Sequence, residues 1–304
     1  MSSVTRAVGA ADGSRQHIMS KLQDLIALLQ VERLELNLFR GTSDDIGSRN
    51  VFGGQVLGQA LMAASRTVEG RSVHSLHAYF LRPGDKSAPI VYDVERSRDG
   101  TSFTTRRVVA IQHGRPIFNT TISFQKEEQG ADHQDAMPVV AGPEGLISEQ
   151  DIMARLHRDL PGGVPEIYRG ERAIEFRPAD PTLPLGSANT SPVFRAWVKA
   201  TGPLPDDPLL HRAMLAYASD YHLLLAAMQP HGYTFVQKDL HVASLDHAMW
   251  FHRPFRMDDW LLYAVDSPSA SGARGLCRGQ FFTQDGRLVA STAQEGLLRK
   301  VVQA

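Results

Sequence analysis

The sequence contains one structural unit twice, and this duplication limits the fold more than any other feature. In the first copy, an apolar helix is expected to begin at residues 52–55 (FGGQ), and four strand-like segments separated by Gly, Pro and Asp turn signals follow it. In the second copy, the helical pattern of residues 208–228 is also followed by four strand-like segments. Phe80 and Phe251 occupy matching positions, 171 residues apart. A repeat of this length indicates a doubled domain rather than a solenoid.

A helix followed by an antiparallel meander, occurring twice, predicts an α+β chain with two curved sheets. Each sheet is expected to wrap its own helix, and the two sheets to join edge to edge. The expected organisation is a flexible lead over residues 1–16, a first unit over 17–125, a linker over 126–170 and a second unit over 171–304. The linker is rich in Gly, Pro, Gln and Glu and contains one short helical pattern.

One carboxylate, Asp220, interrupts the apolar pattern of the second helix. Its helical face also carries Tyr217, Leu224 and Ala227, so the face expected to pack on the core includes an acid. A carboxylate is costly to bury unless hydrogen-bond donors replace its water. The helix pattern leaves two readings open. Either Asp220 is buried among donors, or the helix is rotated so that Asp220 reaches solvent or caps a neighbouring turn.

The composition describes a globular protein with no global attraction for polyanions. The 304 residues include 32 Lys and Arg against 33 Asp and Glu, for a formal charge of -1. This balance argues against nucleic acid or an anionic membrane as a partner. No apolar run is long enough to span a bilayer, and the first residues lack the apolar core of a signal peptide. We therefore expect a cytoplasmic protein.

Neither a metal centre nor a covalent nucleophile is expected. His241, His247 and His252 are not spaced for one helix face or for a tetrahedral loop site, and no cofactor is indicated. The single Cys277 cannot form an intrachain disulfide and is interpreted as a small strand residue. No GxSxG motif is present.

Several long motifs resemble one enzyme family closely. They are FGGQVLGQAL, YFLRPGD, YASD, LDHAMWFHRPF, DDWLLY, SASGARG and QDGRLVASTAQEGLLR. Together they resemble the acyl-CoA thioesterase II family over residues 20–300. The resemblance implies the double hotdog fold and hydrolysis of fatty acyl-CoA. It also implies that an Asp, a Ser or Thr, and a Gln hold and activate a water. By motif position these are Asp220, Ser244 and Gln294.

The strand pattern supports one of these three assignments independently. In the last strand Leu288, Ala290, Thr292 and Gln294 share a face, so Gln294 is expected to point inward toward the helix. There its amide can donate to Asp220 or position a water. For Ser244 the alternation is not decisive, and its role depends mainly on the resemblance.

A thioester is already activated, so a positioned water and a general base suffice for its hydrolysis. Asp220 suits the role of base. Amides at a helix N-terminus can stabilise the oxyanion, although the glycines there could serve only close packing. The candidate substrate-binding residues are Gly53, Gly54, Gln55, His74, Arg82, Arg253 and Arg274. For the arginines, strand-edge pairing is the alternative to contact with the CoA phosphates, and His74 also suits a structural role.

The expected function is hydrolysis of medium- to long-chain acyl-CoA. The alternatives are a hotdog enoyl-CoA hydratase or dehydratase and a non-catalytic acyl-CoA binding protein. Assembly into a homodimer or homotetramer is expected. The repeat offset pairs Asp220, Ser244 and Gln294 with Arg49, Val73 and Ile122, none of which can replace them. We therefore expect one site per chain.

Overall fold

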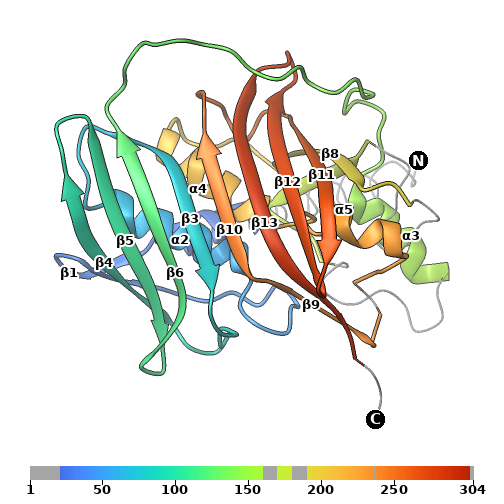
Figure 1. The fold of residues 1–304 in the computed structure, drawn as a ribbon, viewed down its shortest axis with the longest axis horizontal. Helices are drawn as coiled ribbons and strands as arrows, with labels where there is room; N and C mark the ends of the chain where they lie inside the picture. The colour runs from blue at the N-terminus through green and yellow to red at the C-terminus, as the bar shows by residue number, and fades with distance from the viewer. Residues whose placement is uncertain (1–20, 160–169, 180–189, 236, 302–304) are drawn as a thin grey trace, which may run out of the picture.

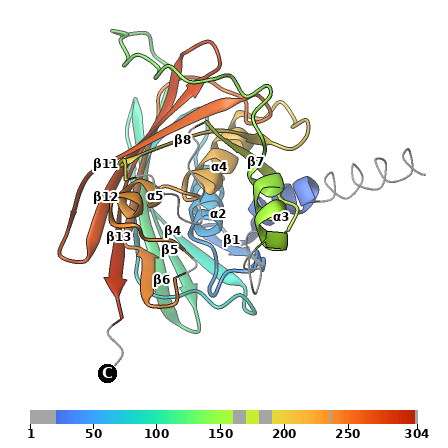
Figure 2. The same ribbon diagram turned by 90° about the vertical axis from the view of Figure 1, so that its right-hand side faces the viewer.

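The computed structural model describes residues 21–159, 170–179, 190–235 and 237–301. Figure 1 shows one continuous sheet running across the molecule. The sheet has 13 strands in the order β1-β2-β4-β5-β6-β3-β10-β13-β12-β11-β8-β7, with β9 paired to β13 off this path. Figure 2 shows the sheet as a curved layer with α2 and α4 on its concave side. The predicted double hotdog architecture is confirmed.

The first unit consists of one hairpin, one long helix and four further strands. The expected four-stranded meander is wrong in one respect: β4, β5 and β6 form a meander, but β3 pairs with β6 and not with β4. Residues 21–29 are helical. The other elements are β1 (Glu32–Glu35), β2 (Leu38–Gly41), α2 (Gly53–Ser65), β3 (Ser72–Phe80), β4 (Ile90–Asp99), β5 (Phe103–Gln112) and β6 (Arg115–Gln125).

The second unit repeats this order, with β10 paired to β13, and has an added segment between its helix and its strands. It follows α3 (Glu149–Asp159) and comprises β7 (Ile174–Pro178), β8 (Val193–Ala200), α4 (Pro208–Ser219), α5 (Leu225–Met228), the short 3₁₀ helix η2 (Gln229–His231), β9 (Leu240–Ser244), β10 (Asp246–Phe251), β11 (Leu261–Ser271), β12 (Arg274–Thr283) and β13 (Leu288–Lys300). The added segment holds α5 and η2, while the end of β9 and the whole of β10 correspond to β3.

The two halves of the sheet join through β3 and β10, which pair antiparallel. His77 lies opposite Ala248 in this pairing, and these are equivalent positions of the repeat. The strand order on either side is mirrored, because β6, β5, β4 and β2 follow β3 as β13, β12, β11 and β8 follow β10. A local twofold axis therefore passes through the β3–β10 pair.

The two long helices cross the concave side in opposite directions and approach each other closely. A Cβ added at Gly54 would lie 2.2 Å from the carbonyl oxygen of Tyr217, and one at Gly58 would lie 3.1 Å from that of Ala213. Only glycine permits such contact between helix backbones. As a result, the first residues of α2 lie against the last residues of α4.

The helix expected over residues 208–228 is wrong in its second half. It ends at Ser219, with Asp220 as the C-terminal cap residue. The phenolic oxygen of Tyr263 donates to the Ser219 carbonyl oxygen at 2.9 Å, and His222 has a φ of 63°, in the left-handed region. These features turn the chain away from the helix axis, because non-glycine residues rarely adopt this conformation within a helix. Asp220 thus lies at a chain turn, not in a continuous helix.

A β-bulge at Leu245 separates β9 from β10. Ala248 lies opposite Ala293, and Ser244 lies opposite Gly296. Between these two pairs the β9–β10 segment has one more residue than β13, which is the signature of a bulge. The first unit has a register shift at the equivalent place, between Val73 and Ser75 of β3. The duplication therefore extends to the irregularities of the strands.

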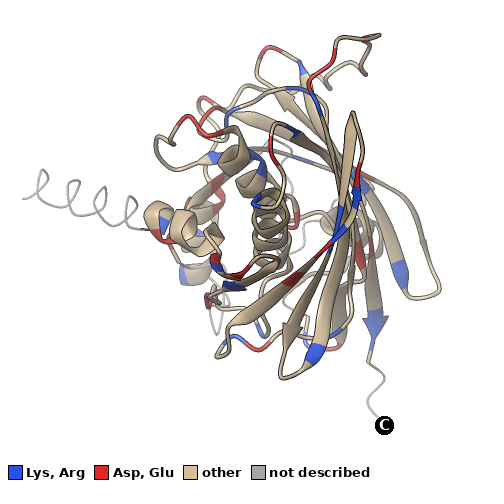
Figure 3. Cartoon of the chain, turned by 90° about the vertical axis from the view of Figure 1, so that its left-hand side faces the viewer, with Lys and Arg blue, Asp and Glu red and all other residues tan. Residues whose placement is uncertain are grey.

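The segment after β6 packs along the second unit. Met137, Val140 and Leu146 contact a small core that includes Trp197 and Phe282. The Trp197 indole also donates to the Ala141 carbonyl oxygen at 2.8 Å. Within the described ranges, no helix is long and apolar enough to cross a membrane. Figure 3 shows basic and acidic residues interspersed over the strands and loops.

Candidate active site

The candidate site lies where the end of α4 meets the start of α2. Asp220 is partly exposed, and the backbone N–H of Gly54 lies near enough to its carboxylate to lower the pKa. A Cβ added at Gly53 would lie 2.6 Å from Asp220 Oδ2. The glycines thus bring the N-terminus of α2, with its partial positive charge, against the acid. The first unit therefore supplies part of a site in the second unit.

The three residues assigned by resemblance lie together. Ser244 Oγ donates to Asp220 Oδ1 at 3.3 Å, and Gln294 Nε2 donates to Ser244 Oγ at 2.8 Å. Gln294 is buried, at 1% exposure, on the inward face of β13 as its strand pattern predicts. Ser244 faces the same way because the Leu245 bulge reverses the alternation between β9 and β10. The bulge is the reason that strand alternation alone could not orient this serine.

The surroundings of Asp220 favour its protonated form more than water does. Burial raises the pKa of the carboxyl to about 7, while hydrogen bonds from Ser244, Gln294 and the Gly54 backbone oppose the rise. A carboxylate with this pKa is ionised in part at neutral pH and accepts a proton more readily than an ordinary Asp. It has the properties of a general base.

Aromatic rings enclose one side of the acid. The ring of Phe52, which precedes α2, lies 4.4 Å from that of Tyr221 and 5.1 Å from that of Tyr217, measured between centroids. Phe80 of β3 lies near Gly53. These rings therefore pack around the junction of α2 and α4 that carries Asp220.

The sequence interpretation missed His247 as a member of the site. Its Nδ1 lies 2.5 Å from Gln294 Oε1 and its Nε2 lies 3.0 Å from Ser219 Oγ. The ring is fully buried, and burial lowers its pKa to about 4. The sequence carried a signal for this position, since strand alternation places His247 on the inward face with Met249 and Phe251.

The other predicted binding residues are dispersed, and each has a protein partner. The Gln55 amide bonds Thr42 and Asp44, and His74 bonds Ser123. Arg82 donates to the Pro116 carbonyl oxygen, Arg253 to Leu288 and Asp132, and Arg274 to Glu295. These contacts correspond to the structural alternative for each residue.

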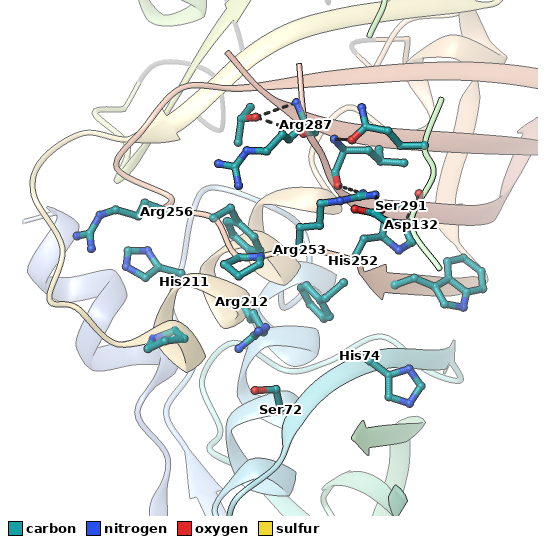
Figure 4. Close-up of a pocket in the computed structure, with 18 of the residues that line it drawn as sticks. Ser72, His74, Asp132, His211, Arg212, His252, Arg253, Arg256, Arg287 and Ser291 are labelled. Atoms are coloured by element: carbon teal, nitrogen blue, oxygen red, sulfur yellow. Dashed lines mark hydrogen bonds and ion pairs between the residues drawn. The ribbon is translucent and has the colours of Figure 1, made fainter. Parts of the chain in front are cut away.

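A large cavity, about 1830 Å³, lies at the opposite end of α4 (Figure 4). Val73, Pro208 and Phe251 line it. Two of these, Val73 and Phe251, are the repeat counterparts of Ser244 and Phe80, and Pro208 begins α4 as Gly53 begins α2. The cavity thus occupies the place related to the Asp220 site by the local twofold axis. Its charged residues have both signs, with Arg212 and Arg287 beside Asp206 and other acids.

The counterpart of Asp220 is Arg66, which corrects the expected match with Arg49. Arg66 is the C-terminal cap residue of α2 as Asp220 is that of α4. The repeat offset failed here because the added segment with α5 and η2 lies between this helix and the strands that follow it. Arg66 donates to the Val31 carbonyl oxygen and to Gln30, and its guanidinium cannot act as a base at neutral pH.

No metal-type cluster occurs among the described residues, where no three His, Cys, Asp or Glu side chains are grouped to hold an ion. Cys277 is fully buried, and burial raises the pKa of its thiol to about 11. A thiol in this state is a poor nucleophile.

Comparisons with known proteins give a consistent result. The family model "Acyl-CoA thioesterase" matches residues 164–297, and the model "Acyl-CoA thioesterase N-terminal domain" matches residues 39–125. The chain is 44% identical to acyl-CoA thioesterase 2 of Haemophilus influenzae, over 91% of this chain and 98% of that protein. It is 42% identical to acyl-coenzyme A thioesterase 8 of Homo sapiens, over 90% and 88% of the two chains. The crystal structure of acyl-CoA thioesterase II TesB2 from Mycobacterium marinum is similar at a TM-score of 0.74 and 43% identity, covering 91% and 98% of the two chains.

Proposed function

The chain belongs to the acyl-CoA thioesterase II family and is a thioester hydrolase, and on this premise we propose that Asp220, Ser244 and Gln294 hydrolyse medium- to long-chain acyl-CoA. The observation that carries the proposal is the carboxylate with a raised pKa, held by Ser244 and Gln294 against the start of α2.

In the proposed reaction, ionised Asp220 takes a proton from a water as the water oxygen attacks the thioester carbonyl carbon. The negative charge passes to the carbonyl oxygen, and polar hydrogens at the start of α2 and on Gln294 are the nearby groups able to stabilise it. When the tetrahedral intermediate collapses, the carbon–sulfur bond breaks and the CoA thiolate leaves. A thiol pKa near 8.5 makes it a good leaving group, and the Asp220 proton can return to it. The products are the fatty acid and CoA.

The hydratase alternative requires a histidine that reaches the substrate together with an acid. His247 is the histidine nearest the three site residues in the hydrogen-bond network, and both of its ring nitrogens have protein partners in the buried core. This arrangement favours hydrolysis over addition of water to an enoyl group. The binding-protein alternative predicts tight association with acyl-CoA and no free CoA.

The proposal is tested by measuring thiol release from acyl-CoA substrates of increasing length, from acetyl to palmitoyl. We expect release of free CoA with the highest kcat/KM for the medium and long chains. Failure of the wild-type protein to release CoA from any of them would contradict the proposed function. A maximum at acetyl-CoA would contradict only the chain-length part. A homodimer or homotetramer and a cytoplasmic location stay predictions, to be tested by light scattering and by fractionation.

A further inference from the structure

Five side chains form one continuous hydrogen-bond path around the candidate site. It runs from Ser219 to His247 at 3.0 Å, to Gln294 at 2.5 Å, to Ser244 at 2.8 Å, and to Asp220 at 3.3 Å. The first and last members are adjacent in the sequence, at the end of α4. The path therefore leaves the helix end, crosses β10, β13 and β9, and returns to the next residue of the same helix end.

The direction of every hydrogen bond follows from the charge of Asp220. An ionised carboxylate only accepts, so the hydroxyl proton of Ser244 points to Asp220. Ser244 Oγ must then accept from Gln294, which turns the amide nitrogen of Gln294 toward the site and its Oε1 away from it. Gln294 Oε1 is itself an acceptor, so His247 must donate to it from Nδ1.

The ring of His247 has only one proton to donate. Burial lowers its pKa to about 4, so it is neutral where Asp220 is ionised. With the proton on Nδ1, Nε2 is an acceptor, and the Ser219 hydroxyl supplies its donor. Ser219 Oγ also lies 2.9 Å from the Ala216 carbonyl oxygen, so the single hydroxyl proton of Ser219 is shared between that oxygen and His247 Nε2. Each hydrogen bond along the path from Ser219 to Asp220 then has one donor and one acceptor.

The opposite tautomer would disturb the site. With the proton on Nε2, His247 would accept at Nδ1, and the Gln294 amide would rotate to present its nitrogen there. Gln294 Oε1 would then face Ser244 and compete with Asp220 for the hydroxyl proton. The position of one proton on a buried ring thus decides whether Gln294 acts as a donor toward the site.

We propose that His247, protonated on Nδ1, is a positioning residue that fixes the Gln294 amide with its nitrogen toward Ser244 and Asp220. This inference rests on the proposed function, in which Gln294 is a donor. His247 itself does not touch substrate. Without its Nδ1–H, Gln294 Oε1 loses its partner in a buried place, and the amide is free to take either orientation.

The direct test is the tautomeric state of His247 in the wild-type protein. With ¹⁵N-labelled histidine, its signals are identified among the 12 histidines by their absence from the His247→Asn variant. At pH 8 we expect a protonated Nδ1 and an unprotonated Nε2. A proton on Nε2, or rapid exchange between the two nitrogens, would overturn the proposal. This measurement does not depend on catalytic activity.

A pair of variants tests the role of the donor in catalysis. In His247→Asn, the side-chain amide N–H of the asparagine can take the place of the Nδ1–H. His247→Leu removes this donor and puts an apolar side chain in its place. We expect His247→Leu to lower kcat about 10- to 100-fold with little change in KM. His247→Asn should keep a kcat much closer to that of the wild-type protein. Equal kcat values in the two variants, with equal melting temperatures, would show a purely structural role.

A double variant separates this inference from the proposed function. If His247 acts only through Gln294, His247→Leu should have almost no further effect on kcat in a Gln294→Ala background. Independent, multiplicative losses would contradict the inference while leaving the hydrolase proposal intact. If the wild-type protein releases no CoA, the proposed function fails, and the tautomer measurement still decides the orientation of Gln294.

Discussion

The carboxylate of Asp220, at the end of the second long helix, lies against Gly53 at the start of the first, where an added Cβ would be 2.6 Å from Oδ2. The contact joins the two repeats at the acid itself. The close approach depends on Gly53 and Gly54 together, because a side chain at either would collide with Asp220 or with the Tyr217 carbonyl. Groups of both units therefore build the site.

Replacing the proposed base should abolish hydrolysis without unfolding the protein. Asp220→Asn keeps the size of the side chain but cannot take up the proton, so we expect most of kcat to be lost. Asp206→Asn, which alters an acid beside Arg256 in the distant cavity, is the control and should retain activity. In the wild-type protein, kcat should rise with pH through about 7, as Asp220 ionises. A folded Asp220→Asn variant with normal turnover would show that another group is the base.

The same substitution should change how stability depends on pH. The folded-state pKa of Asp220 is about 7, above its ordinary value of 3.8, so between these values the folded state binds more protons than the unfolded state. Stability contributed by this group is therefore present at pH 4 and is lost as pH rises through 7. Asp220→Asn should melt higher than wild type at pH 8, and the difference should shrink toward pH 4. A difference that does not vary with pH would mean that the carboxyl is not perturbed.

Gly53→Ala should damage the site more than the fold. Its Cβ would lie 2.6 Å from Asp220 Oδ2 and 2.9 Å from the Phe80 ring, so the carboxylate must move. We expect kcat to fall at least about tenfold, since small displacements of reacting groups are costly. Gly130→Ala is the matched control, because nothing lies within 4 Å of its added Cβ. Unchanged kcat in Gly53→Ala would mean that the close contact has no catalytic role.

Each chain should bind one equivalent of a non-hydrolysable acyl-CoA analogue at a catalytic-type site. The twofold-related positions hold Arg66, which cannot act as a base, and Val73 and Ile122, whose side chains have neither a donor nor an acceptor to hold a water. Isothermal titration gives the stoichiometry, and Gly53→Ala should weaken the binding. Two equal sites per chain would overturn the prediction.

A buried ion pair should stabilise the turn that follows Asp220. Glu149 Oε2 of α3 lies 3.0 Å from His222 Nε2 and 3.3 Å from Arg172 Nη1, and His222 carries the left-handed backbone. Burial raises the pKa of the Glu149 carboxyl, but its two partners outweigh burial and hold the pKa below the usual value. Its contribution is present above pH 4.5 and is lost as pH falls.

Glu149→Gln should therefore lower the melting temperature at pH 7, by an amount that decreases toward pH 4. It should also lower kcat, because the turn positions Asp220. Glu175→Gln, which alters a less buried ion pair with Arg177, is the control and should have a smaller effect. Unchanged melting at pH 7 would show that the Glu149 pair does not hold the turn.

The sequence predicted those parts of the fold that depend on periodicity. The duplication implied edge-joined sheets, and the alternation along β13 placed Gln294 inward. The end of α4 was not predictable, because residues 220–228 keep an apolar, helix-compatible pattern while a tertiary hydrogen bond from Tyr263 and the φ of His222 end the helix. The face of the sheet toward which the Ser244 side chain points was not predictable either, since no residue type marks the bulge at Leu245. His247 was visible on the inward face, but its partners become apparent only when β10 and β13 are paired.

The bulge that orients Ser244 has its counterpart beside His74, although Val73 and Arg66 stand there in place of the serine and the acid. For protein engineering, the backbone features that the repeat already provides can therefore be distinguished from the side chains that would have to be introduced. The backbone of a second site is already in place, and Val73 and Ile122 occupy the positions that correspond to Ser244 and Gln294. Changing these together with Arg66 would not suffice, because the helix facing them begins with Pro208 and Leu209, where glycines would be needed for a carboxylate to approach. Conversion to a two-site enzyme requires redesign of a helix terminus before any catalytic side chain is installed.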